Sequence, residues 1–241
     1  MNMNTSHHNQ SIQNKPAVIA GLSLLIMTIA AAFSYGYAHS SLIVSGEPAT
    51  TFHNLQASRL LFDMEIVGWV VIILTDIFVS WSFYILLKPV HRQYSLLAGW
   101  LRLLYTAVLA TAVSHLVIAS RIVRDGTSLF NDSLNDRASQ TLLSVTAFES
   151  IWSFGLILFG VHLIVTGLLA LMARQIPTFI GILLMAAGFS YALIHVLYSF
   201  MPQLDGVTSV LETILGIPMF IGELSFGIWL LLKGRKTAAI R

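Results

Sequence analysis

Hydrophobic residues run along the chain in six long stretches separated by short polar ones. The stretches cover residues 17–38, 60–87, 96–123, 142–172, 179–201 and 207–232. Each is long enough to cross the hydrocarbon layer as a helix, which takes about 20 apolar residues. The content of 56% hydrophobic and 10% charged residues, with a mean hydropathy of +0.79, lies outside the range of soluble domains. The pattern predicts an all-α, polytopic membrane bundle of about six transmembrane helices.

The polar ends of the chain define its expected organisation. We expect residues 1–16 to form a disordered cytoplasmic tail and residues 17–233 to form a single transmembrane helical domain. Residues 234–241 are expected to form a basic cytoplasmic tail. Basic residues favour cytoplasmic loops, and the basic residues in the loops and tails sort into a larger and a smaller set. The larger set is Lys15, Lys88, Arg92, Arg174, Lys233, Arg235, Lys236 and Arg241, against Arg59, Arg121, Arg124 and Arg137 on the other side. We therefore expect both termini in the cytoplasm of a cell whose inner (plasma) membrane holds the protein.

The net charge and the absence of cysteine exclude several kinds of partner and of chemistry. The net charge of +2 is explained by this anchoring, so the predicted partner is the lipid bilayer and no nucleic acid is expected. The chain has no cysteine, which excludes thiol catalysis, disulfides and iron–sulfur clusters.

Acidic residues recur at the same spacing in two of the predicted helices. Glu65 and Asp76 are eleven positions apart in one helix, and so are Glu212 and Glu223 in another. Eleven residues make about three turns, so each pair shares a helix face. Ionisable groups at membrane depth are costly and usually face the bundle interior or a wet cavity.

Centring each helix in the bilayer sorts the ionisable residues into two levels. The inner level is a buried polar network of Asp76, Arg102, His162 and Glu223. The outer level holds candidate ligand-binding residues, namely Glu65, His115, His195 and Glu212, with Glu149 closer to the surface. Glu149 and His162 are thirteen positions apart and face different directions, which favours a peripheral Glu149 and a core His162. His39, His53 and His91 lie near expected loops, and no role is assigned to them.

Four functions remain open on this evidence. The first is binding or translocation of a small solute, protons or cations through the polar core. The second is a metal-dependent membrane enzyme in which Glu65, His115, His195 and Glu212 hold the metal, although no HExxH motif is present. The third is a haem or quinone protein that uses two of His115, His162 and His195, of which His115 and His195 lie at similar depth. The fourth is a scaffold or regulatory partner with no ligand, in which an ion pair of Arg102 with Asp76 or Glu223 only stabilises the helix packing. The sequence favours non-enzymatic transport or sensing, and leaves the cofactor, the substrate and the oligomeric state open.

Several stretches resemble a known family in order and spacing. They are "LLKPVHRQYSLLAGWLRLLYTAVL", "LFGVHLIVTGLLALMARQIPTFIGILLMAAGFSYAL" and "IPMFIGELSFGIWLLLKGRK". The matching positions are Asp76, Arg102, the Phe159-Gly160-Val161-His162 run, Pro177 with Gly181, Gly188 with Tyr191, and Gly222-Glu223. The chain is thereby similar to the bacterial membrane family catalogued as domain of unknown function 4386. The resemblance implies a multi-helix inner-membrane protein and emphasises the inner network. This chain has Ile194 and His195 where family members often carry an acid, so the resemblance supports the outer level less.

Overall fold

The computed structural model describes residues 3–124 and 133–232, with side chains described from residue 15 onward. The described chain is helical: α1 (Met3–Ala31), the π-helical segment η1 (Ala32–His39), α2 (Ser40–Leu42), α3 (Pro48–Ala57), α4 (Arg59–Leu87), α5 (Arg92–Arg124), α6 (Leu134–Met172), α7 (Thr178–Phe200), the short 3₁₀ segment η2 (Pro202–Leu204) and α8 (Asp205–Leu232).

Six spans among the described residues are long and apolar enough to cross a membrane. They are Lys15–Leu42, Arg59–Leu87, Arg92–Arg124, Leu134–Met172, Thr178–Phe200 and Pro202–Leu232. The shortest has 23 residues, or about 35 Å of helix, which exceeds the roughly 30 Å hydrocarbon layer. The prediction of an all-helical, multi-pass membrane protein is confirmed.

The structure describes most of the first predicted tail and none of the second. Helix α1 already begins at Met3, within the segment expected to be a disordered tail. Residues 234–241, expected to form the basic tail, lie outside the described residues.

The contacts within the chain group its residues into two compact units. Unit 1 comprises Met1–Ile26, Thr75–Thr106 and Ser153–Arg241, and unit 2 comprises Met27–Leu74 and Ala107–Trp152. Because α4, α5 and α6 are long, each contributes residues to both units.

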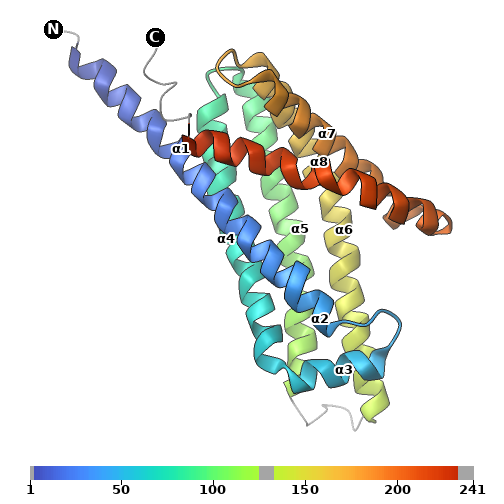
Figure 1. Ribbon diagram of the computed structural model, residues 1–241. Coiled ribbons are helices and arrows are strands. Elements are labelled where there is room, and N and C mark those ends of the chain that lie inside the picture. Colours follow the sequence, from blue (N-terminus) through green and yellow to red (C-terminus); the bar gives the residue numbers. More distant parts are fainter. Residues whose placement is uncertain (1–2, 125–132, 233–241) are drawn as a thin grey trace. The chain divides into compact units, whose positions relative to one another are not determined.

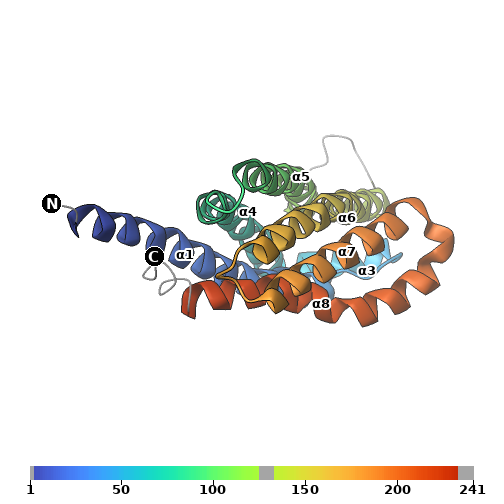
Figure 2. The ribbon, with the colours of Figure 1, turned by 90° about the horizontal axis from the view of Figure 1, so that it is seen from above.

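Unit 1 is built on close helix–helix packing at glycine. Helices α7 and α8 are joined by η2 and pack against each other, side by side in two perpendicular views (Figures 1 and 2). On α6 and α7, a Cβ at Gly160 would lie 2.6 Å from the carbonyl oxygen of Gly188, and one at Gly167 would lie 2.9 Å from that of Gly181. Small residues at such positions let membrane helices approach closely.

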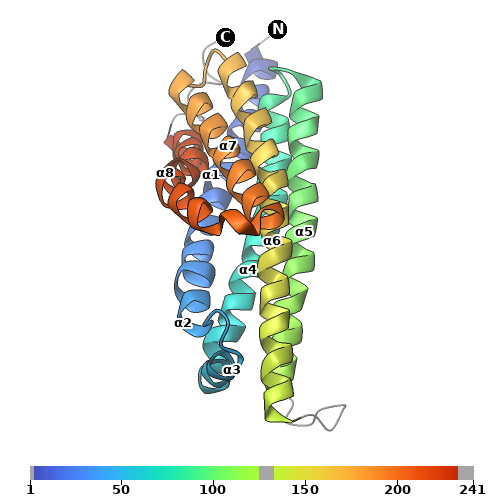
Figure 3. The same cartoon turned by 90° about the vertical axis from the view of Figure 1, so that its right-hand side faces the viewer.

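Unit 2 contains the turn between the first two spans. After η1 and α2, the short helix α3 leads into the start of α4 (Figure 3). Pro48 occupies the first turn of α3, where its missing N–H costs no hydrogen bond. In the same unit Gly68 of α4 meets η1 closely, since a Cβ there would lie 2.0 Å from Oγ of Ser34.

Candidate functional site: a buried ionic network

A guanidinium in unit 1 lies between two carboxylates. Nε and Nη2 of Arg102 lie 2.8 Å and 2.6 Å from the same oxygen, Oδ1 of Asp76. Nη1 of Arg102 donates to Oε1 of Glu223. These contacts join α4, α5 and α8, so charges from three helices meet at one point.

The same guanidinium contacts an imidazole from α6. Nε2 of His162 lies 3.2 Å from Nη1 of Arg102, and Nδ1 lies 2.9 Å from the carbonyl oxygen of Ala98. The structure therefore brings Asp76, Arg102, His162 and Glu223 into one contiguous network, which we call the Arg102 network.

The Arg102 network is shielded from solvent. Asp76, Arg102 and His162 are fully buried, while the side chain of Glu223 is 14% exposed. The rings of Phe83 and Phe159 lie 5.8 Å and 5.5 Å from Cζ of Arg102, within cation–π range. Phe83 also stacks on His162 at 6.3 Å. Water is largely replaced by aromatic surface around these charges, which strengthens the electrostatic interactions among them.

Each member of the Arg102 network lies well inside its helix. Asp76 lies eleven residues before the end of α4, Arg102 ten after the start of α5, His162 ten before the end of α6, and Glu223 nine before the end of α8. At 1.5 Å per residue each group is about 15 Å from its helix end, which is about half the thickness of a roughly 30 Å hydrocarbon layer.

The hydrogen bonds of His162 fix its protonation. A carbonyl oxygen only accepts, so Nδ1 of His162 carries the hydrogen that bonds to Ala98. A guanidinium only donates, so Nε2 offers its lone pair to Arg102. His162 is thus the neutral Nδ1–H tautomer and adds no positive charge to the Arg102 network.

The packing of α8 positions Glu223. A Cβ at the neighbouring Gly222 would lie 2.6 Å from Cβ of Ala187 on α7. Further along, a Cβ at Gly227 would lie 3.0 Å from Leu24 of α1. Both glycines let α8 approach its neighbours, so the carboxylate of Glu223 reaches the guanidinium.

A second ionic cluster lies in unit 2 and centres on a residue to which the sequence assigns no role. Nδ1 of His39 lies 2.7 Å from Oε1 of Glu65, and Nε2 lies 3.1 Å from Oε1 of Glu149. We call these three residues the His39 triad. The first predicted helix ends at residue 38, one position before His39, whereas the observed span continues through η1 to Leu42.

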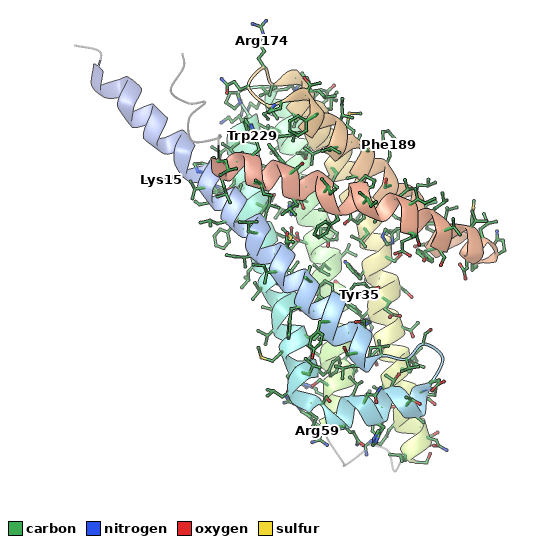
Figure 4. All side chains as sticks on the ribbon, in the orientation of Figure 1. Lys15, Tyr35, Arg59, Arg174, Phe189 and Trp229 are labelled. Atoms are coloured by element: carbon green, nitrogen blue, oxygen red, sulfur yellow. The ribbon has the colours of Figure 1, made fainter. Side chains whose placement is uncertain are left out.

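Aromatic side chains surround the His39 triad. Tyr35 stacks on His39 at 5.3 Å, and Phe148 lies 5.6 Å from the same ring. Trp152 contacts Tyr35 at 4.7 Å and Trp69 at 4.9 Å, both edge to face. Figure 4 labels Tyr35 on the helix that carries this segment. π-helical turns are rare and frequently occur at functional sites, and here η1 carries both Tyr35 and His39.

The outer candidate residues make separate local contacts. Nδ1 of His195 lies 2.9 Å from Oγ of Ser153, and the hydroxyl of Tyr198 donates to Glu212 at 2.7 Å. His115 is half-buried on α5. Glu65 belongs to the His39 triad, and Glu149 joins it with a side chain that is 43% exposed. Among the described residues, no group of three or more histidines and acids is arranged to hold a metal ion.

Comparison with known proteins identifies the family of this chain. A protein of Archaeoglobus fulgidus, described as an uncharacterized protein, is 30% identical over 176 residues, which cover 73% of this chain and 87% of that protein. No solved structure matches the chain. The family described as Domain of unknown function (DUF4386) matches residues 19–234, a range that contains both ionic clusters. The chain therefore belongs to the DUF4386 family of membrane proteins.

Proposed function

We propose that this membrane protein binds and translocates protons or small cations, and that the Arg102 network is the binding site. The role is non-enzymatic: the ion exchanges on buried carboxylates without a covalent step. Charged side chains within membrane spans commonly mark ion pathways and proton relays.

The observation that carries the proposal is a charge count. The Arg102 network has two carboxylates, Asp76 and Glu223, and one guanidinium. His162 is neutral by its hydrogen bonds, so two ionised acids would leave one negative charge uncompensated in a buried site. An uncompensated buried charge is costly. A proton on one carboxyl, or a bound monovalent cation, removes that cost.

The exposure of the two acids suggests which one exchanges. Asp76 is fully buried and takes two guanidinium nitrogens on one oxygen, whereas Glu223 retains 14% exposure. We assign the exchange to Glu223 and the fixed counter-charge to Asp76.

The proposal includes the location and orientation of the protein. We place it in the inner (plasma) membrane with both termini in the cytoplasm, on the excess of lysine and arginine in that set of loops. With this orientation Lys88, Arg92 and Arg174 flank the cytoplasmic ends of α4, α5 and α6.

The experiment is ion flux in liposomes that contain the purified protein. Proton movement is followed with an internal pH-sensitive dye under imposed pH, Na⁺ and K⁺ gradients. We expect flux above that of protein-free liposomes, and its loss in Glu223→Gln, which keeps the shape of the side chain and removes its charge.

The matched control is Glu212→Gln on the same helix. Glu212 is exposed and pairs with Tyr198, outside the Arg102 network, so flux should persist in this variant. Flux equal to that of protein-free liposomes under every gradient, or undiminished flux in Glu223→Gln, would contradict the proposal.

A further inference from the structure

His39 bridges a buried acid and a half-exposed one, an arrangement that the function proposed for the Arg102 network does not use. We propose that His39 relays protons between Glu149 and Glu65, so that the His39 triad is a second site of the protein, one that loads a proton onto a buried carboxylate. The inference concerns unit 2 alone and does not depend on ion flux.

The geometry requires shared protons. Both ring nitrogens of His39 lie within hydrogen-bond distance of a carboxylate oxygen, at 2.7 Å and 3.1 Å. A neutral imidazole has a single N–H, and an ionised carboxylate only accepts. Both contacts are hydrogen bonds only when the three groups hold at least two protons in total, for example as an imidazolium between two carboxylates or as a neutral ring beside one carboxylic acid. The His39 triad therefore holds at least one proton that can move.

The arrangement suits protons better than a metal ion. The two nitrogens of an imidazole point away from opposite edges of the ring, so Glu65 and Glu149 approach His39 from different sides. An ion bound at one nitrogen would not reach the carboxylate at the other.

One end of the relay is accessible and the other is not. The side chain of Glu149 is 43% exposed, whereas Glu65 is fully buried. Glu149 lies on α6, whose 39 residues extend about 58 Å and so exceed the roughly 30 Å hydrocarbon layer. His39 lies three residues before the end of its span, and Glu65 lies six after the start of α4. We therefore place Glu149 at the aqueous boundary.

The buried end has unused hydrogen-bonding capacity. Oε2 of Glu65 and Nε1 of Trp69 are both buried, and neither has a hydrogen-bond partner within the described parts of the chain. Trp69 follows Glu65 by one helical turn on α4, so the two groups share a face. An ionised Glu65 would thus be poorly satisfied, which favours its acceptance of a proton from His39.

The transfer step balances as a simple proton shift. A protonated Glu149 gives its proton to Nε2 of His39, while Nδ1–H of His39 gives its proton to Oε1 of Glu65. The products are an ionised Glu149, the Nε2–H tautomer of His39 and a neutral Glu65 acid. The reverse transfer restores the starting tautomer. The titratable groups in hydrogen-bond contact with His39 are Glu65 from α4 and Glu149 from α6, and Tyr35 of η1 stacks on the ring.

The test is the rate at which Glu65 becomes protonated. The full-length protein in lipid nanodiscs is taken through a rapid downward pH jump, and the carboxylic-acid band of Glu65 is followed by infrared spectroscopy. The band is assigned by its absence in Glu65→Gln. Because positioned proton-transfer groups accelerate such steps by about 100-fold or more, we expect His39→Gln to slow the protonation of Glu65 to a similar extent.

Two further variants separate a relay from a structural role. In His39→Ala, added imidazole should restore the rate, which a merely structural residue would not allow. His53→Gln, which changes an exposed histidine of α3 in the same unit, should leave the rate unchanged. An unchanged rate in His39→Gln, or no rescue by imidazole, would overturn the inference.

The result is distinct from that of the flux experiment. Absent flux together with a His39-dependent rate contradicts only the function proposed for the Arg102 network. Normal flux with a rate that does not depend on His39 contradicts only the relay.

Discussion

His162 accepts a hydrogen bond from Arg102 at a nitrogen that lies 3.2 Å from Nη1. The opposite ring nitrogen donates to a backbone carbonyl, so the ring is fixed as a neutral acceptor. This relationship gives the Arg102 network its charge. If His162 were a cation, two positive and two negative groups would balance, and no site would remain for a further proton or cation.

The first prediction concerns the tautomer of His162. Nitrogen-15 NMR of histidine-labelled protein should show a hydrogen on Nδ1 and none on Nε2, because the carbonyl of Ala98 accepts only from Nδ1. The resonances are assigned by their loss in His162→Gln. A hydrogen on Nε2, or on both nitrogens, would contradict the charge count.

The second prediction concerns the cost of removing the guanidinium. Arg102→Met should lower the free energy of unfolding by about 3–5 kcal/mol, because it leaves Asp76 and Glu223 without a counter-charge in a buried site. Adding Asp76→Asn should recover part of the loss, which a double-mutant cycle from unfolding in detergent would measure. The control is Arg124→Met: Arg124 is 56% exposed in its pair with Asp63, and such exposed pairs contribute about 1 kcal/mol or less. Additive effects of Arg102→Met and Asp76→Asn would show that the two groups are not coupled.

The third prediction concerns the packing of α6 on α7. Gly160→Ala should reduce stability by about 1–3 kcal/mol, the usual cost of overpacking, because its Cβ would lie 2.6 Å from the carbonyl oxygen of Gly188. Gly216→Ala in α8 meets no atom within 4 Å, so it should be neutral or stabilise the helix by up to about 1 kcal/mol. Thermal unfolding of both variants distinguishes the two positions, and equal midpoints would contradict the close approach.

The fourth prediction concerns the attachment of η1 to α4. Gly68→Ala places a Cβ 2.0 Å from Oγ of Ser34, so the hydroxyl must turn away from the carbonyl of Glu65 that it now contacts at 3.1 Å. The lost hydrogen bond should cost about 1 kcal/mol. In the Ser34→Ala background that bond is already absent and the clash is relieved, so Gly68→Ala should then cost less. An equal cost in both backgrounds would contradict the contact.

The sequence predicts the six spans, and it also groups Asp76, Arg102, His162 and Glu223 at one level, because both inferences use regular α-helical geometry. Long apolar runs require helices in a bilayer. The eleven-residue spacing places Asp76 on the same helix face as Glu65, and Glu223 on the same helix face as Glu212. Once the helices pack, a buried arginine requires nearby acids, so Asp76, Arg102 and Glu223 are expected together. The neutral state of His162 was not predictable, since it depends on a contact with a backbone carbonyl on another helix.

The His39 triad illustrates what regular helical geometry misses. The segment "AFSYGYAH" forms a π-helix, whose turns contain more residues than those of an α-helix. Face assignments at 100° per residue fail there, and the apolar run ends one residue before His39. One feature of the sequence could have indicated a role for His39. It directly follows the first predicted span, and two other predicted helices carry Glu65 and Glu149, acids for which the sequence offers no obvious partner.

The residues of the predicted outer level have separate contact partners in the structure. Depth estimates group Glu65, His115, His195 and Glu212, but depth along a helix does not determine which way a side chain faces. Glu65 contacts His39, while His195 and Glu212 contact Ser153 and Tyr198. Local partners therefore decide these contacts, and spacing alone could not identify them.

Equilibrium infrared spectroscopy of the carboxyl groups tests the central claim most directly. Spectra of the wild type, Asp76→Asn and Glu223→Gln are compared near neutral pH, with and without Na⁺ or K⁺. The account predicts one carboxylic acid in the Arg102 network that disappears in Glu223→Gln, or an ionised Glu223 whose band shifts when the cation is added. Two ionised carboxylates that respond to neither Na⁺ nor K⁺ would contradict it, because the buried site would then hold its surplus negative charge without a proton or a cation.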